Sequence, residues 1–128
     1  MLYLLLSTLF GGKYMIHKMK LRKVYYDMIK NGTKIYEGRL NDEKRQLIDV
    51  GDVIIFQKEP DLSESFEAVV KDLIYFDSFE EMANTLPLEK VGFETETPED
   101  VVEIYHQFYS DEEEKKYGIV AIKVEVLK

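Results

Sequence analysis

The stretch that decides the fold runs from Tyr26 to Arg39 and reads YDMIKNGTKIYEGR. Before Gly32, apolar residues recur at helical spacing and predict a helix over residues 22–30. Gly32 ends that helix, because glycine readily adopts the left-handed conformation that follows a helix C-terminus. Residues 33–40 then predict a strand. The stretch is therefore a helix, a glycine turn and a strand in immediate succession.

Three charged residues of the predicted strand are the candidate site: Lys34, Glu37 and Arg39. Glu37 and Arg39 are two positions apart, so they share one face of a strand and either pair with each other or bind a ligand. In a regular strand Lys34 would point to the opposite face. A joint site of Lys34 and Glu37 requires a bulge or twist, for which Gly38 is the candidate.

The spacing Gly32-x-Lys34-x-x-Glu37-x-Arg39 resembles the signature of the ASCH domain family. Three further segments resemble the family in the expected order, at residues 50–56, 79–82 and 117–122, and the resemblance spans about residues 19–127. It implies an α+β fold, a PUA-like small β-barrel decorated with short helices. It also implies a cleft between the signature strand and the long connection before the last strand.

The rest of the chain is consistent with this fold. Strands are predicted at residues 16–21, 52–57, 65–76 and 118–127, with a bulge in the third between Val70 and Leu73. Helices are predicted to begin after Ser78, in a capping-box pattern with Glu81, and after Thr97. Short helices between strands favour an α+β domain or a decorated barrel over regular βαβ repeats.

The first residues, MLYLLLSTLF, form an apolar run that is too short to span a membrane and lacks the features of a signal peptide. The codons of Gly11-Gly12-Lys13 can contain a purine-rich bacterial ribosome-binding site. We therefore expect translation to begin at Met15 or Met19. On this hypothesis residues 1–14 are a non-native or disordered leader, and residues 15–128 are a single domain.

Composition limits the classes of function. The chain has no cysteine, and its two histidines, His17 and His106, match no zinc-ligand spacing, so we expect no metal site and no cofactor. The net charge is −8, yet residues 13–45 carry 10 basic against 4 acidic side chains. Such a chain should avoid DNA and membranes but can still contact phosphate locally. We expect a cytoplasmic protein.

The candidate residues have distinct chemistry. Lys34 can bind phosphate or act on a carbonyl, Arg39 offers a planar donor fork, and Glu37 can accept a proton or an exocyclic amine. Four tyrosines are possible stacking platforms or core residues: Tyr36, Tyr105, Tyr109 and Tyr117. Tyr105 lies on an apolar helical stripe of Val101, Ile104, Tyr105 and Phe108, which favours the core. The run from Asp111 to Lys116 is typical of a solvated helix start.

The family resemblance implies RNA binding, and one bacterial subfamily hydrolyses the acetyl amide of acetylated cytidine with a lysine, a threonine and a glutamate. That lysine falls on Lys34 and that glutamate near Glu94, but the threonine falls on Glu37, which is a departure. Our leading hypothesis is a module that binds RNA or a nucleotide-like ligand through Lys34, Glu37 and Arg39, with Tyr36 and Tyr117 nearby. The alternatives are an amidohydrolase acting on an acylated nucleoside and a protein-interaction module.

Overall fold

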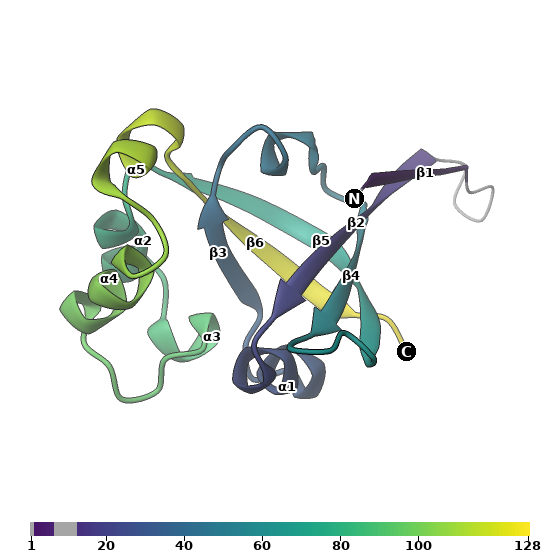
Figure 1. Ribbon diagram of the computed structural model, residues 1–128, viewed down its shortest axis with the longest axis horizontal. Helices are drawn as coiled ribbons and strands as arrows, with labels where there is room; N and C mark the ends of the chain where they lie inside the picture. The colour runs from purple at the N-terminus through teal and green to yellow at the C-terminus, as the bar shows by residue number, and fades with distance from the viewer. Residues whose placement is uncertain (1, 7–12) are drawn as a thin grey trace.

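Six strands form one curled sheet in the order β1-β2-β4-β5-β6-β3 (Figure 1). The computed structural model describes residues 2–6 and 13–128, with side chains from Lys13 onward. The strands are β1 Leu2–Leu6, β2 Lys13–Leu21, β3 Tyr36–Leu40, β4 Val53–Lys58, β5 Ser65–Phe76 and β6 Ile119–Val126. All neighbours are antiparallel except β2 and β4.

The helices are short and lie between the strands, as predicted. They are α1 Lys23–Asn31, α2 Phe79–Thr85, α3 Leu88–Val91, α4 Pro98–His106 and α5 Asp111–Tyr117, with a 3₁₀ turn, η1, at Arg45–Leu47. Figure 1 shows α2, α3, α4 and α5 gathered on one side of the sheet and α1 at one end of the barrel. The α+β, barrel-like fold with short helices is confirmed.

The barrel does not close by backbone pairing. Among the described residues, β3 pairs only with β6, and the end of β2 beyond His17 pairs only with β4. The free edges of β2 and β3 therefore form a seam. The long strand β5 makes the curl possible, because it pairs with β4 through residues 65–69 and with β6 through residues 68–76. Its register shifts between Val70 and Asp72, which confirms the predicted bulge.

Two apolar cores lie on the two faces of β6. Val120, Ile122 and Val124 face the barrel interior, whereas Ile119 and Ala121 face the cluster formed with α2, α3 and α4. The sequence correctly predicted the first set. The burial of the second set was not predicted, because Lys123 and Glu125 suggested that the opposite face is solvated. The helices cover that face over the first half of the strand.

Helix α1 closes one end of the barrel with Tyr26 and Ile29, which are each 1% exposed. Gly32 follows it with φ of 88°, as predicted for a left-handed C-terminal residue. Val24, one of the apolar residues at helical spacing in this helix, is exposed. The buried residues of this short helix are Tyr26 and Ile29, so its apolar face is narrower than the sequence suggests.

The later helices begin where they were predicted to begin. The Ser78 side chain accepts a hydrogen bond from the Glu81 amide, and Thr97 and Asp100 form a reciprocal capping box. Helix α4 ends at His106, so Phe108 lies beyond it and is 51% exposed, contrary to its expected place in the buried stripe.

The predicted leader, residues 1–14, lies partly outside the described residues. Within it, Leu2–Leu6 form β1 and pair with residues 13–17 of β2. The position of the translation start and the domain boundary at residue 15 stay predictions. In the part of the chain that the structure describes, none of the helices has the length and apolar character needed to cross a membrane.

Candidate functional site

A cavity of about 270 Å³ lies at the seam between β2 and β3. Its lining comes from the end of β2, from α1, from the signature strand and from α4 with the turn that follows it. The residues are Lys20, Leu21, Arg22, Tyr25, Lys34, Glu37, Gly38, Arg39, Glu59, Phe93, Ile104, Tyr105, Phe108 and Tyr109. The gap where strand pairing stops is thus the place where the molecule is hollow. Lys34, Glu37 and Arg39 all reach it.

Lys34 reaches the cavity without a bulge in the strand. It lies before β3, which begins at Tyr36 rather than at the predicted residue 33, and β3 pairs with β6 in continuous register through Gly38. The Lys34 ammonium donates to the carbonyl oxygens of Tyr36 and Val91, each at 2.6 Å, and lies 3.2 Å from Glu37 Oε1. These contacts use the three donors of the ammonium group.

Glu37 is the acidic centre of the site. One carboxylate oxygen faces Lys34, and the other accepts a hydrogen bond from Arg39 Nε at 2.7 Å. Arg39 also donates from Nη2 to the Lys20 carbonyl of β2 at 2.9 Å. The sequence left open whether Glu37 and Arg39 pair or bind. In the structure they pair with each other and also line the cavity.

Burial and the neighbouring charges shift the pKa values of Lys34 and Glu37 in opposite directions. Burial lowers the pKa of Lys34, although the nearby Glu37 carboxylate offsets part of the effect. Burial alone would raise the pKa of Glu37, but Lys34 and Arg39 together outweigh it and hold that pKa below its usual value. Glu37 is therefore an ionised acceptor between two cations, and Lys34 is a more acidic ammonium than one in water.

Tyr105 of α4 lies directly over Gly38 of β3. A Cβ added at Gly38 would lie 2.8 Å from the Tyr105 hydroxyl oxygen, closer than a real Cβ atom can approach. The absence of a side chain at Gly38 therefore allows the hydroxyl to reach the cavity. Burial, with the nearby Glu37 charge, raises the pKa of Tyr105 well above 10.0, so its phenol is a neutral donor. The sequence predicted Tyr105 as a core residue and missed this role.

Aromatic rings form much of the cavity wall. The Phe93 ring meets Tyr25 and Tyr105 edge to face, with centroids 6.0 Å apart in each pair. At the mouth, the Arg22 guanidinium lies 4.5 Å above the ring of the exposed Phe108. Tyr25 and Phe93 were not predicted as site residues, because the sequence separates them by 68 positions and neither belongs to the signature.

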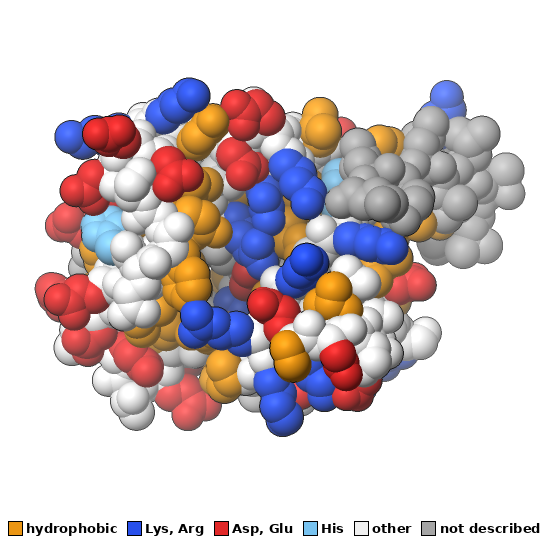
Figure 2. Space-filling view, viewed as in Figure 1, with side chains coloured by type: hydrophobic (Ala, Val, Ile, Leu, Met, Phe, Trp, Pro, Cys, Tyr) orange, Lys and Arg blue, Asp and Glu red, His pale blue; other side chains and the backbone are white. Residues whose placement is uncertain are grey.

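The cavity lining carries two exposed basic side chains at the rim and one exposed acidic side chain, Glu59. Lys20 and Arg22 are exposed on the rim, next to Arg39. Figure 2 shows Lys and Arg side chains gathered at the centre of this face, with most Asp and Glu side chains toward the helical side. Four of the basic residues of 13–45 line the hollow, namely Lys20, Arg22, Lys34 and Arg39, while the acidic second half of the chain supplies helices α2 to α5.

The other predicted site residues lie elsewhere. Tyr36 is half-buried in the core formed with the helices, and only its backbone carbonyl contacts the site, through Lys34. Tyr117 donates a hydrogen bond to Glu43 at 3.0 Å and lines a separate depression. Glu94 is exposed next to Phe93 and does not line the cavity. The structure thus brings Lys34, Glu37 and Arg39 together at the cavity. The side chains of Tyr36, Tyr117 and Glu94 lie elsewhere.

The fold and the cavity define a PUA-like barrel with a ligand-sized hollow at its seam. The sequence profile of the ASCH domain matches residues 19–128, and the chain belongs to the ASCH domain family, a group of PUA-like modules proposed to bind RNA. This confirms the family suggested by the Gly32-to-Arg39 spacing.

Solved structures support the same assignment. The hypothetical protein PH0355 is 40% identical, with a TM-score of 0.79, and the match covers 88% of this chain and 99% of that one. Protein PF0455 from Pyrococcus furiosus is 38% identical, with a TM-score of 0.73 and coverage of 88% and 98%. The ASCH protein from Zymomonas mobilis shares the fold at 12% identity, with a TM-score of 0.61 and coverage of 86% and 66%. No curated protein matches the chain.

Proposed function

We propose that this protein binds RNA by receiving a single unpaired base in the seam cavity. The observation that carries the proposal is that the Glu37 carboxylate, the Tyr105 hydroxyl and aromatic walls line one hollow of about 270 Å³. A volume of that order suits one base or nucleoside and not a run of bases. Aromatic side chains and polar groups that reach base edges are the usual means of recognising unpaired RNA.

The groups in the cavity complement a planar heterocycle. The Glu37 carboxylate is a pure acceptor and can receive the N–H of an exocyclic amine. The Tyr105 hydroxyl, which forms no hydrogen bond with another of the described residues, can donate to a ring nitrogen or a carbonyl oxygen. Lys20 and Arg22 at the mouth can contact the flanking phosphates, because both are exposed on the rim. A protein that binds RNA in this way would act in the cytoplasm.

The proposal is tested by titrating the full chain with short single-stranded RNA and following fluorescence anisotropy at several salt concentrations. We expect micromolar binding that weakens as salt increases, with a slope corresponding to about two phosphate contacts. Duplex RNA of the same sequence should bind at least tenfold more weakly. Equal binding of duplex and single strand would contradict insertion of a base.

Variants separate the cavity from the rim. Tyr105→Phe removes the phenol donor and should weaken single-strand binding about tenfold with no change in the salt slope. Lys20→Gln should instead reduce the slope by about one. Lys115→Gln is the matched control, because Lys115 is exposed on α5 away from the cavity. If all three variants bind alike, the cavity is not the binding site.

A second candidate function is hydrolysis of an acylated nucleoside, and one observation favours it. Lys34 Nζ and Glu37 Oε1 lie 3.2 Å apart in a concave site, which is the geometry an acid–base pair requires. Glu37 would take a proton from a water molecule as the water oxygen adds to the acyl carbon. Lys34 would give a proton to the nitrogen as the carbon–nitrogen bond breaks, leaving a carboxylic acid and an amine.

Turnover of N-acetylated cytidine decides between the candidates. An active protein should lose at least 100-fold in kcat on Lys34→Met or Glu37→Gln. Binding of the same nucleoside without turnover leaves the binding function and removes the hydrolytic one. The control is again Lys115→Gln, which should leave both measurements unchanged.

A further inference from the structure

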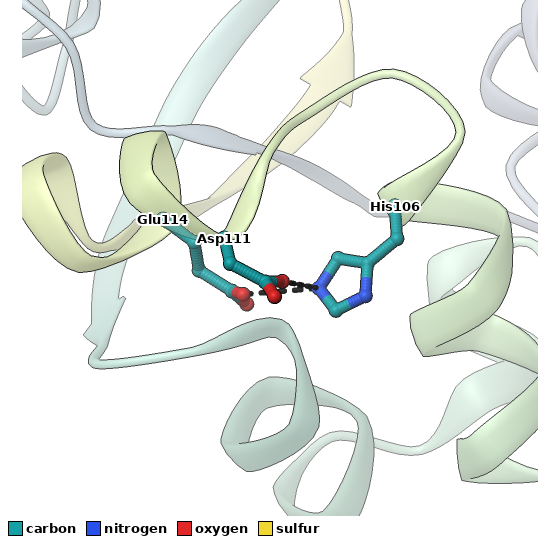
Figure 3. Close-up of side chains that lie close together, drawn as sticks. All are labelled: His106, Asp111 and Glu114. Atoms are coloured by element: carbon teal, nitrogen blue, oxygen red, sulfur yellow. Dashed lines mark hydrogen bonds and ion pairs between the residues drawn. The ribbon is translucent and has the colours of Figure 1, made fainter.

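A second cluster of side chains lies outside the cavity, where α4 passes into α5. His106 is the last residue of α4, and Asp111 and Glu114 are one turn apart on α5. Figure 3 shows the three side chains turned toward one another across the connecting turn. His106 Nε2 lies 3.0 Å from Glu114 Oε1 and 3.7 Å from Asp111 Oδ1, and one ligand atom from each residue lies within 4.8 Å of the others.

We propose that His106, Asp111 and Glu114 bind a divalent transition-metal ion of the zinc type. Zinc binds imidazole nitrogen and carboxylate oxygen at about 2.0–2.2 Å, so two such ligands in a tetrahedron lie about 3.4 Å apart. The separations of 3.0 and 3.7 Å bracket that value. Three protein ligands leave one coordination position for water.

The Glu114 carboxylate is held in place before any ion binds. The Glu114 side chain is 11% exposed, and its Oε2 accepts a hydrogen bond of 2.6 Å from the Phe79 backbone amide at the start of α2. Its other oxygen, Oε1, faces the imidazole. A metal ligand whose second oxygen is fixed by a neighbouring N–H is the arrangement that orients carboxylates in known sites. An ion here would connect α4 with α5, and Glu114 already links α5 to α2 through the Phe79 amide.

The kind of ion follows from the donors. Imidazole nitrogen favours Zn²⁺, Ni²⁺ and Cu²⁺ over Mg²⁺ and Ca²⁺, which prefer oxygen ligands only. The first turn of α5 contains four acidic residues, so the local potential also attracts a cation. In the ion-free protein Nε2 and Glu114 Oε1 lie 3.0 Å apart. An ion between them would bind Nε2 of the neutral imidazole with the ring hydrogen on Nδ1, and any hydrogen on Nε2 would be released to water.

The other histidine of the chain offers no comparable site. His17 is 4% exposed and lies 2.8 Å from Asp52, whose two oxygens also accept the backbone N–H groups of Met15 and Asp49. The Asp52 oxygens are therefore already occupied by three donors. The expectation of no metal site rested on the absence of cysteine and on the spacing of the two histidines. This cluster instead combines one histidine with two carboxylates, and neither criterion detects that combination.

The test uses the chelator-treated full chain and Zn²⁺ alone, measured by titration calorimetry and thermal unfolding, with Mg²⁺ as the comparison ion. We expect one Zn²⁺ per chain with micromolar affinity, a Tm increase of several degrees, and no effect of Mg²⁺. His106→Gln should weaken Zn²⁺ binding at least 30-fold and Asp111→Asn about tenfold. Glu112→Gln, in the same acidic turn but outside the cluster, should bind as the parent does.

A spectroscopic readout makes the assignment independent of folding effects. With only two histidines in the chain, addition of Co²⁺ should broaden the ring resonances of His106 and leave those of His17 sharp. Glu114→Gln is not used, because it also changes the bond to Phe79. If Zn²⁺ does not saturate, or if His106→Gln and Asp111→Asn bind it as tightly as the parent, the cluster is an ion pair and the proposal is wrong.

Discussion

The guanidinium of Arg39 on β3 donates to the backbone carbonyl of Lys20 on β2 at 2.9 Å, across the seam where the two strands do not pair. The same guanidinium holds Glu37 at 2.7 Å. One side chain thus joins the two free edges of the barrel and also fixes the acidic group of the cavity. Closure of the barrel and construction of the site depend on the same residue.

Arg39→Lys should therefore be far from conservative. A lysine has one ammonium in place of a planar fork, so it cannot keep both contacts. We expect a loss of about 2–3 kcal/mol in the free energy of unfolding, since a bond between charged groups and a bond to a carbonyl are both affected. Urea unfolding measures the loss. Arg45→Lys is the control, because among the described residues the Arg45 side chain pairs with Asp42 alone, three positions away. A similar loss there would contradict the special role of Arg39.

Lys34→Met should destabilise the fold more than any exposed lysine substitution does. The change removes a buried ammonium but leaves the carbonyls of Tyr36 and Val91 without their donor. Breaking a buried pair by removing one partner typically costs about 3–5 kcal/mol. Adding Glu37→Gln should cost less in the Lys34→Met background than in the parent, since part of the charge imbalance is already gone. Strict additivity in that double-mutant cycle would show that the two groups do not interact.

The folding stability should fall in acid partly through Glu37. Lys34 and Arg39 outweigh the effect of burial and lower the pKa of Glu37 in the folded protein below the ordinary 4.5. A lowered folded pKa means that the contribution of Glu37 to stability is complete above the unfolded pKa and is lost as pH falls through the folded value. Urea midpoints from pH 7 to pH 3 should therefore fall less steeply for Glu37→Gln than for the parent. Parallel curves would contradict the lowered pKa.

Gly38→Ala tests the close approach of Tyr105. The new methyl group would lie 2.8 Å from the phenol oxygen and 3.0 Å from Met82 Sδ, which should cost about 1–3 kcal/mol of stability. Tyr105→Phe removes the oxygen, so the double variant should recover a substantial part of the loss. Gly32→Ala is the contrast: its Cβ meets nothing within 4 Å, its cost comes from the positive φ, and Tyr105→Phe should not reduce it. Equal effects of Tyr105→Phe in both backgrounds would refute the steric account.

The sequence predicted the local elements well because their signals are local. Gly32, the Thr97 cap and the alternation in β6 each act within a few residues. The spacing of the signature also predicted Lys34, Glu37 and Arg39 as candidate site residues, and the structure brings these three side chains to one cavity. The sequence could not predict how Lys34 reaches the site, because that depends on the Val91 carbonyl at the end of α3, 57 positions away in the sequence.

The aromatic walls of the cavity were unpredictable for a related reason. Phe93 and Tyr25 meet only after α1 and the loop beyond α3 have packed against the same seam. Periodicity assigned Tyr105 to the core, and the adjacent Phe79 ring, stacked at 4.2 Å, shows that this was partly correct. The Tyr105 hydroxyl can reach the cavity because residue 38 is a glycine and leaves space beneath it. The sequence shows a glycine there but not what lies above it.

The burial of Lys34 also has a consequence for its chemical reactivity. Among the lysines of residues 13–128, which the structure describes with side chains, Lys34 alone is buried, and each of its hydrogens is engaged by a partner within the fold. An acylating or alkylating reagent needs the free amine, so the rate at which Lys34 is modified measures how often the Val91 carbonyl releases it. The modification rate of Lys34, a residue of the signature, thus reports how often the site opens.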